Sequence, residues 1–102
     1  MNKVDTPVQR DDLAMDIIEH LDASYGAVVK AKTLRDTFGI SGGTLRVLIN
    51  ELRCQGWPIC SCSRGYYLAC KPAEIEQTIK NLKGRQMKMQ YAIDGLSKLI
   101  YL

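Results

Sequence analysis

Residues 41–56 have the signature of one helix with two unlike faces. Ser41 suits the N-cap, because its hydroxyl can accept a hydrogen bond from a free amide of the first turn. Gly56 can take the left-handed conformation that ends a helix. At about 100° per residue, one face collects aliphatic side chains and the other collects small and polar ones. The aliphatic face is Leu45, Leu48, Ile49 and Leu52. The other face is Gly43, Arg46, Val47, Asn50 and Cys54. The pattern predicts a helix that packs on a core and presents an acid-poor side.

Length and composition fit one globular domain, with room for an appendage. The chain has 102 residues, 46% of them hydrophobic and 25% charged, which excludes a wholly disordered protein. The net charge of +3 is mildly basic and compatible with a polyanionic partner. No apolar run approaches the roughly 18 residues of a membrane span, and the first twelve residues lack the apolar core of a signal peptide. We therefore expect a cytoplasmic protein.

No pattern in the sequence indicates catalysis or a cofactor. The four cysteines are spaced C-x5-C-x-C-x7-C, which matches no common zinc pattern. We expect reduced thiols and no metal, although Cys60 and Cys62 would share a strand face and leave a redox or metal role open. There is no nucleotide-binding loop and no histidine-based cluster, and His20 is interpreted as a solvated or capping residue. The expectation is a protein that is not an enzyme.

The first half of the chain reads as three helices in succession. Residues 1–10 are polar and predicted to be a flexible N-terminus. A helix is expected from Asp11 to about Ala23, and a second from Lys30 to a stop at Gly39. The apolar stripe of the first helix is Leu13, Ile17, Ile18 and Leu21. A tight turn then leads into the helix opened by Ser41, which is a helix-turn-helix pattern.

A β-hairpin is predicted after the third helix. Residues 57–62 and 66–70 are strand-prone runs separated by a Ser-Arg-Gly turn. Val28 and Val29 would add a short third strand. Three helices followed by a hairpin give the element order of a winged helix, with Arg64 near the tip of the wing. The predicted fold class is α+β, mostly α, with this domain over residues 11–71.

Residues 72–102 are predicted to form a long C-terminal helix, with Pro72 in its first turn. Its seam residues repeat at alternating spacings of four and three, which is a heptad pattern. They are Ile75, Ile79, Leu82, Gln86, Met89, Ile93, Leu96 and Ile100. An apolar seam of this length requires a partner, so we expect a coiled-coil homodimer; folding back over its own domain is the alternative. Gln86 is the polar seam residue that can fix register. The direction of pairing stays open.

The segments LRDTFGIS, TLRVLINELRCQGWPI and SRGYYLA resemble the winged helix-turn-helix module of the biotin-operon repressor and of many small bacterial regulators. The run SRGYYLACKPAEIEQTIKNLKG is similar to small prophage-encoded winged-helix proteins with a C-terminal helix. The resemblance covers residues 34–69 well and the rest loosely. It implies a DNA-binding domain whose third helix enters the major groove. Related modules often carry polar or basic residues where this chain has Gly42 and Gly43, which moves the expected base contacts to the middle of the helix.

The chemistry of that helix allows specific assignments. Asn50 can pair with adenine, Arg46 with guanine or a phosphate, and Val47 can contact a thymine methyl group. The start of the helix can hold a phosphate on backbone amides, and basic side chains nearby can contact other phosphates. The residues at the helix start are Ser41, Gly42, Gly43 and Thr44, and the nearby cations are Lys32, Arg35 and Arg64. The alternative for Arg46 and Asn50 is a merely solvated face.

The expected function is therefore a small prophage-type transcriptional regulator that binds a near-palindromic site on double-stranded DNA as a dimer. The alternative is a winged-helix interaction module that docks on host or phage replication or regulatory machinery. Acidic residues should avoid a DNA-binding face, and several of them gather on the first helix instead. They are Asp11, Asp12, Asp16, Glu19 and Asp22.

Overall fold

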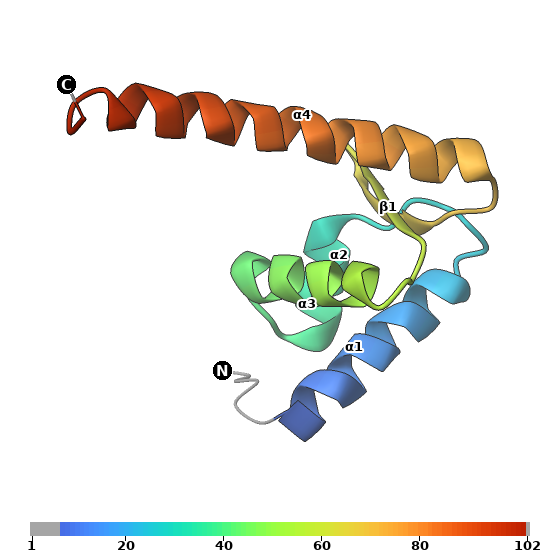
Figure 1. Ribbon diagram of the computed structural model, residues 1–102. Helices are drawn as coiled ribbons and strands as arrows, with labels where there is room; N and C mark the ends of the chain where they lie inside the picture. Colours follow the sequence, from blue (N-terminus) through green and yellow to red (C-terminus); the bar gives the residue numbers. More distant parts are fainter. Residues whose placement is uncertain (1–6, 102) are drawn as a thin grey trace.

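The computed structural model describes residues 7–101 as an α+β fold that is mostly helical. Three helices come first, α1 (Pro7–Asp22), α2 (Ala31–Phe38) and α3 (Gly42–Cys54). An antiparallel hairpin of β1 (Ile59–Cys62) and β2 (Gly65–Leu68) follows, and then the long helix α4 (Pro72–Ser97). In Figure 1 the hairpin lies between α4 and the three-helix part of the molecule.

The core lies between α1, α2, α3 and the hairpin. The aliphatic face of α3 is its centre, since Leu45, Leu48, Ile49 and Leu52 are each 1% exposed. The predicted stripe of α1 meets it from the other side. The buried aliphatic residues are Leu13, Ile17, Ile18, Leu21, Val29, Leu34, Ile40, Leu45, Leu48, Ile49, Leu52 and Ile59. Both predicted apolar faces are thus confirmed, and they fix which side of α3 faces outward.

The turn between α2 and α3 has the helix stop and the N-cap that were predicted from the sequence. Gly39, with φ 63°, ends α2 in the left-handed conformation. Ser41 caps α3, where its Oγ accepts a hydrogen bond of 3.1 Å from the Thr44 amide. At the other end Gln55 is the C-cap, and Gly56 adopts φ 94° one residue later. The short Gly-Ile-Ser connection therefore sets the angle between the two helices.

The hairpin is tied to the helical core through Val29. Its amide donates to the Tyr66 carbonyl oxygen at 2.7 Å, and the Tyr66 amide donates to the Val29 carbonyl oxygen at 2.9 Å. This is a single bridge, so the predicted third strand is reduced to one residue. Gly65, with φ 152°, comes so close to Val29 that an added Cβ would lie 2.1 Å from the Val29 carbonyl oxygen.

Two helix boundaries were predicted wrongly. α1 begins at Pro7, so residues 7–10 are helical, while residues 1–6 of the predicted flexible terminus lie outside the described residues. Proline is tolerated in a first helical turn because its missing N–H would have no partner there. α4 ends at Ser97 rather than at residue 102, and residues 98–100 form a turn that contains Ile100. Leu96 and Leu99 are 65% and 74% exposed, so no packing reinforces a further turn.

α4 crosses the hairpin with its first half and projects beyond the domain with its second (Figure 1). Thr78 is buried against β1, and its Oγ1 accepts from the Ser61 amide at 3.4 Å. The first seam residues Ile75, Ile79 and Leu82 line a 290 Å³ cavity next to β1. None of the helices in the described part of the chain is long and apolar enough to cross a membrane.

Candidate nucleic-acid interface

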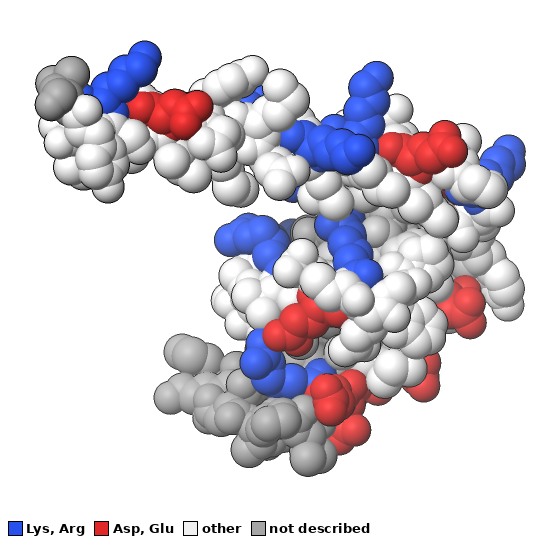
Figure 2. All heavy atoms as spheres, in the orientation of Figure 1, with Lys and Arg blue, Asp and Glu red and all other residues white. Residues whose placement is uncertain are grey.

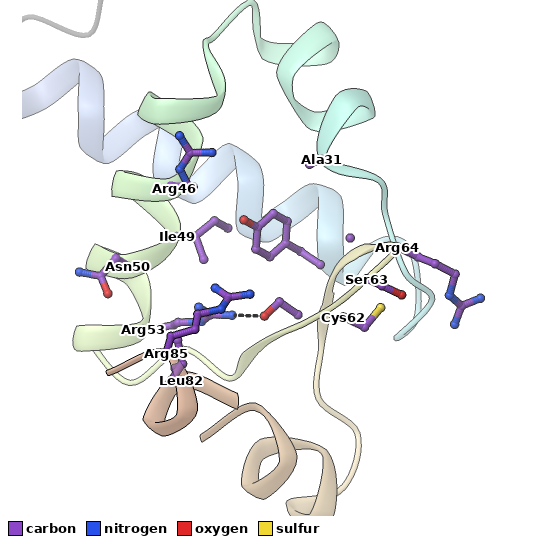
Figure 3. A pocket seen from close by; sticks show the side chains of 13 residues that line it. Ala31, Arg46, Ile49, Asn50, Arg53, Cys62, Ser63, Arg64, Leu82 and Arg85 are labelled. Atoms are coloured by element: carbon purple, nitrogen blue, oxygen red, sulfur yellow. Dashed lines mark hydrogen bonds between the residues drawn. The ribbon is translucent and has the colours of Figure 1, made fainter. Parts of the chain in front are cut away.

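The outward face of α3 carries the three side chains expected to read bases. Arg46, Val47 and Asn50 are all exposed, and Val47 is 46% exposed despite its apolar side chain. The burial of the opposite face holds these residues outward, because rotating α3 would expose its aliphatic stripe. In Figure 3 Asn50 points away from the body of the domain, and Arg46 stands one turn from it on the same helix. These residues are therefore free to approach a partner.

Beside this face a 330 Å³ hollow opens between α3, the hairpin and α4 (Figure 3). Its charged and amide-bearing lining residues are Arg46, Asn50, Arg53, Arg64 and Arg85. A second hollow of 550 Å³ shares Arg85 and part of the hairpin with the first, and extends along α4. It adds Lys80 and Lys88. We call the two hollows together the basic groove.

No acidic residue of the described chain lines the basic groove. Two ion pairs are found among the described residues, Arg10 with Glu51 and Lys32 with Asp36. Neither involves a cation of the groove. In Figure 2 lysine and arginine side chains lie in the space below α4 as well as along its upper side, and acidic side chains lie over α1 and on α4 toward both of its ends. The groove therefore concentrates positive charge that an anionic partner can neutralise.

Arg53 is the most firmly held cation of the groove. Its Nε donates to the Ile59 carbonyl oxygen at 2.8 Å, and its Nη2 donates to Ser61 Oγ at 3.1 Å. Burial is the main cause that lowers the pKa of Arg53; Tyr66 and Cys60 oppose it, and the charge of Arg85 adds a smaller lowering. Arginine still stays protonated at any physiological pH. The guanidinium is thus fixed in place by β1, and no ion pair with a carboxylate is found for it among the described residues.

The start of α3 brings other predicted residues together. A Cβ on Gly42 would lie 3.7 Å from both Arg35 Cδ and Arg46 Nη1, so two cationic side chains flank the first turn. The Thr44 amide donates to the Ser41 cap, so it is not free in this structure, and its contact with a phosphate stays a prediction. Backbone capture of an anion at this end would fall to the amides of Gly42 and Gly43.

The remaining predicted phosphate contacts are less well placed. Lys32 donates to Asp36 one turn along α2, and this hydrogen bond lowers the pKa of the Asp36 carboxyl group. Arg64 is at the hairpin turn and, in Figure 3, points away from the centre of the groove. Arg35 lies against the first turn of α3, with its Cδ 3.7 Å from the Cβ position of Gly42.

Four cations of the groove were not predicted from the sequence as contact residues. Arg53 precedes the end of α3 and gave no sequence signal of its own. Lys80, Arg85 and Lys88 come from α4, where Lys80 and Lys88 are eight residues apart and therefore on one side of the helix. The spacing of these basic residues beside the heptad seam could have been recognised in the sequence. Only the fold, however, shows that this side of α4 faces α3.

The cysteines do not form a metal site in the described part of the chain, where no group of three potential ligands is found. All four are free thiols, and Cys60 is the buried one. Hydrogen bonding from the Arg64 backbone lowers the pKa of Cys62, with further contributions from the Gly65 backbone and the Arg64 charge.

Comparisons with family models, with curated proteins and with solved structures find no match for this chain.

Proposed function

We propose that this protein binds double-stranded DNA through a winged helix-turn-helix domain and acts as a small transcriptional regulator. The observation that carries the proposal is the basic groove without acidic lining, adjacent to the exposed face of α3. A duplex presents a dense row of phosphates, and each one neutralised by a cation releases bound counterions.

In this proposal α3 enters the major groove. Asn50 makes a paired contact with adenine, Arg46 contacts guanine or a phosphate, and Val47 packs on a thymine methyl group. The exposure of Val47 supports that role, because an apolar side chain gains nothing from water. The hairpin acts as the wing, with Arg64 near the DNA backbone.

The far half of α4 supports a homodimer. Met89, Ile93 and Leu96 are between 54% and 65% exposed, although they continue the heptad seam. A second copy of α4 would cover them and place two α3 helices on one duplex, which implies a near-palindromic site. This exposed half also favours a second candidate function, in which α4 docks on another protein.

Selection of bound duplexes from a random DNA pool tests the proposal. We expect an enriched, two-fold symmetric site whose binding weakens steeply as salt rises from about 50 mM. A pool that shows no enrichment, or binding that does not respond to salt, would contradict DNA recognition and favour the protein-docking alternative.

A further inference from the structure

Two arginines from different helices converge in the basic groove. Arg53 of α3 and Arg85 of α4 line the same hollow, and their side chains overlap in the view of Figure 3. Neither takes part in an ion pair within the described chain. Two unpaired like charges repel each other, and an anion bound between them would turn that repulsion into attraction.

The donors of this site suit a phosphate group. A guanidinium has five N–H donors, of which Arg53 uses one on Ile59 and one on Ser61, so the others stay available. Its two hydrogen bonds to β1 hold the remaining donors in a fixed direction. Paired donors of this kind match the oxygens of a phosphate better than a lysine ammonium does.

α4 extends this site along its length. Lys80 and Lys88 line the same groove and are separated by about 12 Å at 1.5 Å per residue. At about 3.4 Å of axial rise per nucleotide of one strand, that span covers roughly three to four nucleotides. Lys80 and Lys88 lie off the seam, because at about 100° per residue each points about 100° away from the seam residue next to it. Arg85 lies closer to the seam, about 60° from Leu82, which lines the same hollow. Dimerisation through the seam would leave Lys80 and Lys88 uncovered.

We propose that a backbone phosphate of the bound DNA strand sits between Arg53 and Arg85, with Lys80 and Lys88 contacting neighbouring phosphates. α4 is then a second wall of the DNA-binding surface as well as a dimerisation helix. This inference rests on the proposed function and adds to it, because no DNA contact was predicted for α4 from the sequence.

The test compares Arg85→Gln with Lys83→Gln in the full chain, using a duplex from the random-pool selection. Both variants remove one positive charge from α4, but Lys83 lines neither hollow of the groove. Arg85→Gln should lower the slope of log affinity against log salt by about 0.9, the value for one lost phosphate contact. Binding between about 50 and 200 mM salt should then fall about threefold less than in the wild type. Sequence preference should not change, because phosphates carry no base identity.

Failure of the proposed function and failure of this inference give different results. If the wild type shows no salt-dependent binding, both the proposed function and this inference fail. If the wild type binds and Arg46→Ala relaxes its sequence preference, but Arg85→Gln has the same slope as Lys83→Gln, only the inference about α4 is overturned.

A second readout separates DNA from other anions. The Nε–H signal of Arg85, assigned from its loss in Arg85→Gln, should shift on adding an equimolar selected duplex and much less on adding inorganic phosphate alone. A signal that saturates with inorganic phosphate and ignores the duplex would overturn the proposal in favour of a small-anion site. Displacement of the duplex by poly-glutamate, with the same dependence on Arg85, would overturn it in favour of an acidic protein partner.

Discussion

Arg53 Nε donates a 2.8 Å hydrogen bond to the carbonyl oxygen of Ile59, which joins the last turn of α3 to the first residue of β1. The same guanidinium reaches Ser61 Oγ. The residue that supplies charge to the basic groove thus also holds the hairpin against α3. A substitution of Arg53 should therefore change both the stability of the fold and DNA binding, whereas substitutions at other positions of the groove can change binding alone.

Arg53→Met should destabilise the fold, because it leaves the Ile59 carbonyl without its side-chain donor in a partly buried setting. We expect a loss of about 1–3 kcal/mol in the free energy of unfolding, measured by urea denaturation. Arg46→Met is the matched control, since Arg46 is exposed and should change stability by no more than about 0.5 kcal/mol. Equal effects at the two positions would contradict the role given to Arg53.

Arg46→Ala combined with Asn50→Ala should relax sequence preference. Each paired base contact is worth about 1–3 kcal/mol of discrimination, so the enriched site from the random pool should lose definition at the corresponding positions. Gln55→Ala controls for general effects on α3, because Gln55 is exposed at its C-cap and does not line the groove. An unchanged preference in the double variant would refute the assignment of these residues.

The sequence predicted the helical core well and the basic groove poorly, for a physical reason. Buried residues of a helix recur with the helical period of about 3.6 residues. The aliphatic face of α3 and the stripe of α1 could therefore be identified without knowing what they pack against. Arg53 and Arg85 become neighbours only through the crossing of α4 over the hairpin, which no local period encodes. The α4 end point was also overestimated, since the heptad continues to Ile100 while the helix stops at Ser97.

Gly65→Ala should destabilise the hairpin strongly. Its φ of 152° disfavours a side chain, and the added Cβ would meet the Val29 carbonyl oxygen at 2.1 Å. A loss of at least about 1–3 kcal/mol is expected in urea denaturation. Gly95→Ala is the contrasting control, because Gly95 lies inside α4 with nothing within 4 Å and should gain up to about 1 kcal/mol from helix propensity. The two glycines should thus move stability in opposite directions, and a neutral Gly65→Ala would contradict the close approach to Val29.

Ile93→Asp should convert the proposed dimer to a monomer in analytical ultracentrifugation. Ile93 is on the seam beyond the domain and 54% exposed, so a carboxylate there would be buried without a partner in the coiled coil. Tyr91→Asp is the control, as Tyr91 is similarly exposed on the same helix but lies off the seam. A wild-type protein that sediments as a monomer at tens of micromolar would refute the dimer itself.

Cys62 should react with iodoacetamide faster than Cys54 at neutral pH. Both thiols are exposed, and the hydrogen bond from the Arg64 backbone lowers the pKa of Cys62. A lowered pKa means a larger thiolate fraction at a given pH below it, and the thiolate is the nucleophile. The advantage should shrink as the pH rises until both thiols are deprotonated.

Cys60 should react slowest because it is buried. Mass spectrometry of partially labelled protein gives the order. Since Cys62 lines the basic groove, bound DNA should slow its labelling more than that of Cys70, which is exposed and lines neither hollow of the groove. Equal protection of Cys62 and Cys70, or protection of neither, would contradict the placement of DNA in this groove.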